Sequence, residues 1–353
     1  MSGSVVQRIL AALLVLGPVT IAAEHAGAGD ITVFILAAAA LIPLAWLIGE
    51  ATEHAARHTG PGIGGFLNAT FGNAPELIIA LFAVNDGLFD VVRASLIGSV
   101  VGNLLLVLGF SLYAGGRGWL DRPSSLTSLG LVALATLLFL IPYVPGQDGD
   151  PNRHALAVLS IIPAVILLAV YLVVVTISLR RHHQMNVADE SAKRRGGWSL
   201  TTSLAVLGVA TVVTALVAEA LVGSIQAFSD SVGLSEFFVA AVIVAIVGNA
   251  AEHGGAVVVA ARGQIKLAAE IALSSSAQVA VFLIPAVALL SWLLQPLSLA
   301  FRTVEMGALA FGVIYTSLLL WGGRSARWRG VLLVAAYVGV AIAFYAAGDR
   351  SSG

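Results

Sequence analysis

Long apolar runs, separated by short charged or Pro/Gly-containing breaks, follow one another along almost the whole chain. A helix rises about 1.5 Å per residue, so about 20 apolar residues are needed to cross the hydrocarbon of a bilayer. The sequence therefore predicts an all-α, multi-pass protein surrounded by the lipid bilayer. We expect eleven transmembrane helices, at 5–23, 31–56, 63–85, 91–114, 125–143, 155–179, 200–226, 235–261, 266–292, 303–321 and 329–347.

Composition excludes several other classes of protein. Of the 353 residues, 59% are hydrophobic and only 10% are charged, which is too little charge for the surface of a soluble globule. No polar stretch is long enough to be a separate soluble domain, and we expect no nucleic-acid partner. The chain has no cysteine, so disulfides and thiolate-bound metals are excluded.

Basic residues predict the orientation in the membrane, because Lys and Arg in short loops are retained on the cytoplasmic side. With the N-terminus inside and the C-terminus outside, only Arg93, Arg153, Arg302 and Arg350 of the 18 basic residues face outward. Most acidic residues of the loops are expected on the outer side. They could form a vestibule that concentrates cations, or they could simply keep the loops soluble.

The number of predicted helices suggests an internal repeat. If 31–179 and 200–353 are two five-helix repeats, the odd number of helices places the second copy upside down relative to the first, and the substrate site is expected at their interface. Residues 1–30 then hold one additional helix, either retained or removed as a signal peptide, in a 1+5+5 arrangement. Residues 180–199 form a basic cytoplasmic linker.

Two matching pentapeptides, GNAPE at 72–76 and GNAAE at 248–252, lie inside apolar runs. A glutamate within a membrane helix is energetically costly, so Glu76 and Glu252 predict one site with two carboxylates. Calcium takes about 6–8 oxygen ligands, more than two carboxylates supply. A glycine weakens the helix and exposes backbone carbonyls, and an asparagine offers an amide oxygen. The predicted cation- and proton-binding residues are Glu76, Glu252, Asn73, Asn249, Gly72 and Gly248, the two glutamates being the direct metal ligands. The alternative for Gly and Asn is close helix packing.

Further polar residues recur in both copies. Residues 99–103 (SVVGN) match 274–278 (SSSAQ), about 26 residues after each pentapeptide, and Glu50 matches Glu219. Two buried carboxylates cannot both stay charged without a cation, so protons and a divalent ion compete for the same oxygens, which is the basis of proton-coupled antiport. His253 could carry a further proton, form a hydrogen bond or simply pack.

Together, FGNAPELII at 71–79, GNAAEH at 248–253, GEATE at 49–53 and SSAQ at 275–278 resemble the calcium/proton exchangers of the calcium/cation antiporter superfamily. The resemblance implies an eleven-helix fold in which Glu76 and Glu252 bind Ca²⁺ and exchange it for H⁺. It also implies supporting roles for Asn73, Asn249, His253, Ser99, Asn103, Ser275 and Gln278, and roles as secondary acids on the ion path for Glu50 and Glu219. The chain departs from the family pattern at Pro75, Gly102, Gly254 and Gly255, and in its basic linker.

Other functions remain open on the sequence. A monovalent exchanger would move Na⁺ or K⁺ against H⁺, although two glutamates suit a divalent ion better. A membrane metalloenzyme could use Glu50, Glu53, His54 and His58, whose histidines are four residues apart. We expect a transporter and not an enzyme, with Ca²⁺ as substrate and no cofactor, in a prokaryotic cytoplasmic membrane, as a monomer or a homo-oligomer. Glu270 and Glu305 are expected in local pairs with Lys266 and Arg302.

Overall fold

The computed structural model describes residues 3–185 and 197–350, and these are helical almost throughout. Within them, nine helices are long and apolar enough to span a membrane. The count is ten if Glu236–Gly248 and Glu252–Ala261, which meet at 58°, form one broken span. The predicted multi-pass, all-α membrane fold is confirmed at this level. Most of the predicted linker at 180–199 lies outside the described residues.

The chain divides into two compact units. The first unit comprises residues 1–79 and 169–224, and the second comprises residues 80–168 and 225–353. Neither unit coincides with a predicted repeat, because each combines segments from both halves of the sequence.

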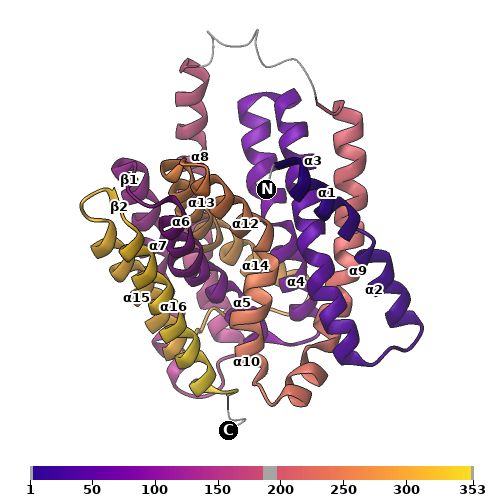
Figure 1. The fold of residues 1–353 in the computed structure, drawn as a ribbon. Coiled ribbons are helices and arrows are strands. Elements are labelled where there is room, and N and C mark those ends of the chain that lie inside the picture. The colour runs from indigo at the N-terminus through magenta and orange to yellow at the C-terminus, as the bar shows by residue number, and fades with distance from the viewer. Residues whose placement is uncertain (1–2, 186–196, 351–353) are drawn as a thin grey trace. The chain divides into compact units, whose positions relative to one another are not determined.

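The first unit is built on one long helix and its neighbours (Figure 1). Its elements are α1 (Gly3–Leu13), α2 (Leu16–His25), α3 (Asp30–Gly72), the start of α4 (Ala74–Asn85), the end of α8 (His154–Met185) and most of α9 (Leu200–Val232). The helix α2 packs along α3. Its Gly17 also lies close to α9, since a Cβ there would be 3.0 Å from Cγ1 of Val213. Ile48 and Ala51 of α3 form a small core with Leu207 and Ala210 of α9.

The second unit has a buried span at its centre. This span consists of α5 (Phe89–Val101), the π-helical segment η1 (Gly102–Val107) and α6 (Leu108–Gly115), and it is 94% buried. Its neighbours come from both halves of the sequence. The other elements of this unit are α7 (Arg122–Tyr143), η2 (Pro145–Gln147), the start of α8, α10 (Glu236–Phe238), η4 (Val239–Val244), α11 (Ala245–Gly248), α12 (Ala250–Ala261), α13 (Ile265–Gln278), η5 (Val279–Leu283), α14 (Ile284–Leu290), η6 (Ser291–Leu293), α15 (Thr303–Leu320) and α16 (Arg327–Ala347).

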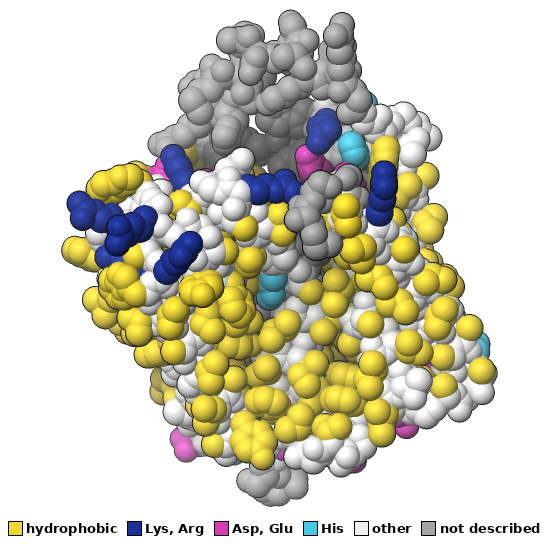
Figure 2. All heavy atoms as spheres, viewed as in Figure 1, with side chains coloured by type: hydrophobic (Ala, Val, Ile, Leu, Met, Phe, Trp, Pro, Cys, Tyr) yellow, Lys and Arg dark blue, Asp and Glu magenta, His cyan; other side chains and the backbone are white. Residues whose placement is uncertain are grey.

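Small residues allow helices of the second unit to approach closely. A Cβ on Gly98 of α5 would lie 2.0 Å from the carbonyl oxygen of Ala241 in η4, and one on Gly330 of α16 would lie 2.5 Å from the carbonyl oxygen of Gly109 in α6. Such contacts are typical of membrane helices, which associate through packing because lipid tails are as apolar as leucine. In Figure 2 hydrophobic side chains are spread over the middle of the face that is shown.

The helices of the second unit end in two chemically different surfaces. At one end, β1 (Gly118–Trp119) pairs with β2 (Arg324–Ser325), and Lys266 is 2.8 Å from Asp121. This basic end holds seven Lys and Arg residues and two acids, Asp121 and Glu270, and dark-blue side chains gather there around β1 and β2 (Figure 2). All seven were predicted to be cytoplasmic: Arg117, Arg122, Arg262, Lys266, Arg324, Arg327 and Arg329.

The opposite end of the second unit is tied together by charged side chains. Arg350 lies 3.6 Å from Asp90, and Asp349 accepts hydrogen bonds from the backbone N–H groups of Glu236 and Phe237. Burial lowers the pKa of the Arg350 guanidinium, and the nearby Arg93 lowers it further. The four arginines that were predicted to face outward are all at this end.

Three local predictions differ from the structure. The segment expected to span at 63–85 is not one helix, because Asn73 has non-helical backbone and separates α3 from the twelve-residue α4. Lys266 pairs with Asp121 and not with Glu270, which accepts a hydrogen bond from Ser124.

Arg302 and Glu305 do interact, but through the backbone. Glu305 accepts from the Arg302 N–H at the start of α15, while the Arg302 guanidinium donates to the carbonyls of Ala347 and Gly348. Partners from neighbouring segments therefore replace the expected side-chain pair.

Candidate functional site

Both pentapeptides break a helix at the asparagine. Asn73 has φ −101° and ψ 16°, and Asn249 has φ −93° and ψ 4°, so each ends one helix and precedes the next. Glu76 lies in the first turn of α4 and Glu252 in the first turn of α12. The N-terminal end of a helix carries partial positive charge from its free N–H groups, which favours a carboxylate there. The predicted opening of the helix before each glutamate is present in both copies.

In the second unit, a chain of hydrogen bonds ends on Glu252. The Ser275 hydroxyl donates to Glu252 Oε2 at 2.5 Å, and Asn103 Nδ2 donates to Ser275 Oγ at 3.2 Å. Asn103 belongs to the central span and Ser275 to α13, so two neighbouring spans position the carboxylate. A hydroxyl that donates to a charged carboxylate makes one of the stronger hydrogen bonds in proteins.

Asn249 is held by the same central span. Its Nδ2 donates to Ser99 Oγ and to the carbonyl of Ala245, both at 2.9 Å. Ser99 and Asn103 are four residues apart on the central span, so they lie on one side of it. The second unit thus brings together Ser99, Asn103, Asn249, Glu252 and Ser275, which the sequence had predicted as site residues.

Three buried polar atoms at this place have no hydrogen-bond partner within the described residues. They are Oδ1 of Asn103, Oδ1 of Asn249 and Nε2 of His253. An unpaired buried polar atom costs about 1–3 kcal/mol, so several of them together call for an explanation. Because both amide NH₂ groups are already used as donors, each asparagine presents an oxygen. The arrangement can offer those oxygens to a cation or to water.

Gln278 and the π-helical segments complete the polar region. Gln278 Nε2 donates to Ser274 Oγ at 3.4 Å, and η5 begins at the next residue. Asn103 lies at the start of η1, the π-helical segment of the central span. Single π-helical turns are frequent at functional sites because they re-aim side chains. Neither segment was predicted, since no residue pattern signals a π-turn.

The first unit holds the other predicted residues. Asn73 and Glu76 are buried. Glu50 is half-buried with its carboxylate 3.5 Å from His54, and Glu219 is exposed on α9.

The metal cluster considered for an enzyme does not form. Within the described parts of the chain, no three His, Cys, Asp or Glu side chains are grouped to hold a metal ion. The His54 ring stacks on Trp198 at 4.9 Å, and His58 Nε2 donates to the Trp198 carbonyl at 2.8 Å. Glu53 pairs with Arg57 at 2.5 Å. The polar stretch in the middle of α3 therefore contacts neighbouring side chains and the segment before α9.

Sequence reasoning missed Arg93, which is 0% exposed. Its guanidinium donates to Asp90 Oδ1 at 2.6 Å, to Asn152 Oδ1 at 2.9 Å and to the Ser298 carbonyl at 3.0 Å. The signal available was Asp90 three residues earlier, which is the spacing of a helical ion pair. Arg93 joins three segments at the end of the second unit opposite the basic end.

Comparisons with known proteins agree with the motifs. A family model described as sodium/calcium exchanger protein matches residues 30–180 and 202–346. The chain is 36% identical over 365 residues to a Ca²⁺/H⁺ antiporter of Synechocystis sp., covering 96% of this chain and 97% of that protein. It is 38% identical over 315 residues to the Ca²⁺/H⁺ antiporter ChaA of Bacillus subtilis, covering 86% and 89%.

A solved structure points to the same relatives. The structure of YfkE, a Ca²⁺/H⁺ antiporter protein, superposes with a TM-score of 0.81 at 33% identity, covering 96% of this chain and 99% of that one. The resemblance drawn from the motifs is thereby confirmed. The matches to the family model cover most of the sequence, and the chain therefore belongs to the sodium/calcium exchanger protein family.

Proposed function

We propose that this chain is a secondary active transporter that moves Ca²⁺ out of the cytoplasm in exchange for external H⁺. Relatives named Ca²⁺/H⁺ antiporter align with nearly the whole chain. The observation that carries the proposal is the hydrogen-bonded chain from Asn103 through Ser275 to Glu252, beside two buried amide oxygens. A carboxylate surrounded by neutral oxygens suits a hard divalent cation, which prefers oxygen ligands.

Glu76 and Glu252 are the proposed charged ligands. Support for Glu76 comes from its position in the first copy, which is equivalent to that of Glu252 in the second. Glu76 follows a break at an asparagine and lies in the first turn of α4, as Glu252 does in α12. Two carboxylates neutralise one Ca²⁺. When the ion leaves, at least two protons are needed to keep a site of low dielectric near neutrality. Competition between Ca²⁺ and H⁺ for the same oxygens couples the two fluxes, and His253 is a candidate for a further proton.

Transport further requires that the site open to each side of the membrane in turn. We propose that this happens between two inverted five-helix repeats in a 1+5+5 arrangement, with the N-terminus cytoplasmic and the C-terminus external. In the second unit seven basic residues lie at the basic end and four at the opposite end, which supports this orientation because basic residues are retained in the cytoplasm. Glu50 and Glu219 would then lie along the ion path as secondary acids.

Calcium is the cargo in this proposal and no resident cofactor is required. The protein is then a transporter of the prokaryotic cytoplasmic membrane and not an enzyme. A monovalent exchanger remains the alternative outcome of the test below.

The test is flux in proteoliposomes. Purified protein is reconstituted, a pH gradient is imposed, Ca²⁺ is added, and Ca²⁺ uptake and luminal pH are followed together. We expect Ca²⁺ to move opposite to H⁺, and Glu76→Gln and Glu252→Gln each to abolish both fluxes. Glutamine keeps the size of the side chain but cannot carry the charge. Glu270→Gln is the matched control, since Glu270 is exposed at the basic end and accepts a hydrogen bond from the Ser124 hydroxyl.

Flux like that of the unmodified protein in either Glu76→Gln or Glu252→Gln would contradict the paired-glutamate site. Proton flux driven by Na⁺ or K⁺ and not by Ca²⁺ would replace the calcium exchanger with the monovalent one. Size-exclusion profiles and helical circular dichroism confirm that each variant is folded before flux is compared.

A further inference from the structure

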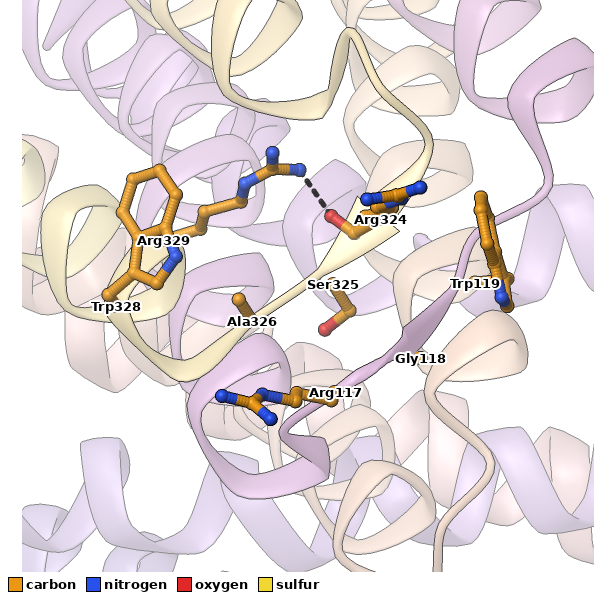
Figure 3. A pocket seen from close by; sticks show the side chains of 8 residues that line it. All are labelled: Arg117, Gly118, Trp119, Arg324, Ser325, Ala326, Trp328 and Arg329. Carbon is orange, nitrogen blue, oxygen red and sulfur yellow. Dashed lines mark hydrogen bonds between the residues drawn. The ribbon is translucent and has the colours of Figure 1, made fainter.

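A cavity of about 530 Å³ lies at the basic end of the second unit, between β1, β2 and the start of α16. Its lining includes Arg117, Arg324 and Arg329 together with Trp119 and Trp328 (Figure 3). We call these five residues the arginine pocket. The ion-transport chemistry described above makes no use of it.

Among the residues that the structure describes, no acidic side chain balances the positive charge of the arginine pocket. Within the described residues, none of its three arginines forms an ion pair. The two acids at this end are engaged elsewhere: Asp121 binds Lys266 and the Ser124 N–H, and Glu270 accepts from the Ser124 hydroxyl. A concave basic surface of this kind attracts an anion from solution or from the membrane surface.

Two of the arginines are held in place. The Arg324 guanidinium lies over the Trp119 ring at 4.9 Å, and the Arg329 guanidinium over the Trp328 ring at 5.2 Å. Arg329 Nη1 also donates to the carbonyl of Arg324, as Figure 3 shows, while its Nε is buried without a partner among the described residues. Fixed guanidinium groups match the oxygens of a phosphate and lose little entropy on binding it.

The surroundings favour an amphipathic ligand over a free phosphate ion. Trp119 and Trp328 are 66% and 57% exposed, and tryptophan is enriched where membrane helices meet the headgroups. Toward the middle of the helices the exposed surface becomes apolar, with Leu126 on α7, Leu318 on α15 and Val331 on α16 all more than half exposed. A phosphate in the pocket would therefore have an apolar surface beside it for acyl chains.

We propose that the arginine pocket binds the headgroup phosphate of an anionic phospholipid. The site is separate from the ion path, and the proposal stands whether or not the chain exchanges Ca²⁺. Basic pockets between membrane helices are suited to such headgroups because the charge is concentrated where the phosphates lie.

The test is lipid binding by the full-length protein in an uncharged detergent. Dioctanoyl phosphatidylglycerol, dioctanoyl phosphatidylcholine and inorganic phosphate are titrated separately, and bound lipid is counted by native mass spectrometry. We expect phosphatidylglycerol to bind more tightly than phosphatidylcholine, and more weakly as salt is added. Each basic residue near such a surface contributes about fivefold to the affinity for an anionic lipid. The double variant Arg117→Gln/Arg324→Gln should therefore weaken the binding of phosphatidylglycerol about thirtyfold.

Three variants guard against indirect effects. Arg262→Gln removes an exposed arginine at the same end but outside the pocket, and it should leave binding unchanged. Arg117→Gln alone should weaken binding about fivefold without disturbing the fold, since Arg117 has no hydrogen bond or ring contact in the described structure. Arg117→Lys/Arg324→Lys keeps the charge but not the guanidinium geometry, so its affinity should lie between that of the unmodified protein and that of the double glutamine variant.

Equal affinities for the two lipids would overturn the proposal. A loss of phosphatidylglycerol affinity in Arg262→Gln as large as that in the double glutamine variant would overturn it as well. Binding of inorganic phosphate as tight as that of phosphatidylglycerol would also overturn it, since the pocket would then bind a free anion.

Discussion

Replacing Gly98 by alanine tests the close crossing that positions the central span. A Cβ at this position would lie 2.0 Å from the Ala241 oxygen, 2.8 Å from the Ala241 carbonyl carbon and 2.9 Å from Ala245 Cβ. The first two atoms are backbone and cannot rotate away. Restoring ordinary contact therefore requires α5 and η4 to separate by more than an ångström.

The magnitude follows from two opposing terms. Overpacking a well-packed site costs about 1–3 kcal/mol, and a clash with backbone lies at the upper end of that range. Alanine in a helix gains about 1 kcal/mol over glycine. The expected net loss for Gly98→Ala is roughly 2 kcal/mol, which corresponds to about 4–8 °C in Tm for a unit of this size.

Gly102→Ala is the matched control, because Gly102 is buried one turn further along the same span and a Cβ there meets nothing within 4 Å. This variant should keep its Tm or raise it. Thermal unfolding in one detergent, followed by circular dichroism, compares the two. Because Ser99 is adjacent to Gly98 and holds Asn249, flux should fall in Gly98→Ala as well. Equal Tm values for the two variants would refute the packing argument.

Two further predictions concern single hydrogen bonds. Ser275→Ala removes the hydroxyl that donates to Glu252. A hydrogen bond to a charged group is worth about 1.5–3 kcal/mol, so the apparent Ca²⁺ affinity should fall at least about tenfold. The control Ser276→Ala should leave the Ca²⁺ affinity unchanged. Equal affinities, measured as Ca²⁺ concentration for half-maximal flux, would exclude a role for this hydroxyl. The hydrogen bond from Lys266 lowers the pKa of Asp121, and so does the one from the Ser124 N–H. A lowered pKa contributes stability above pH about 4 that is lost as the pH falls through the folded-state value. Asp121→Asn should therefore lower Tm at pH 7, and its difference from the unmodified protein should shrink as the pH falls below about 4. A Tm difference that persists unchanged at low pH would contradict the assignment.

The positions of apolar helices and of helix breaks were predictable from the sequence. Both depend on the hydropathy and the glycine content of a few neighbouring residues. Most apolar runs gave helices close to the expected positions, although α3 continues from Asp30 to Gly72 across the break expected between 56 and 63. The pentapeptides gave the breaks at Asn73 and Asn249. The choice of Glu252, Ser275 and Asn103 as site residues also came from matching the two halves of the sequence. Their hydrogen bonds to one another, however, join spans that are more than 20 residues apart in the chain.

Pairing of charged side chains was the main failure. Spacing along a helix predicted Lys266 with Glu270, yet the structure places Asp121 from another connection 2.8 Å from the Lys266 amine. A surface pair within one helix is worth only about 0.3–0.5 kcal/mol, so any better-placed partner displaces it.

The sequence by itself determined that this chain crosses a membrane many times, that two glutamates each follow a broken helix, and that the chain resembles calcium/proton exchangers. These properties follow from local hydrophobicity and from residue identity at fixed spacing. Only the tertiary structure decided which hydroxyl meets Glu252, that Arg93 is buried, and that β1 and β2 bring the arginines of two distant connections around one cavity. Those outcomes depend on which helices pack together, and a side chain's nearest partner across a helix interface is not encoded in its distance along the chain.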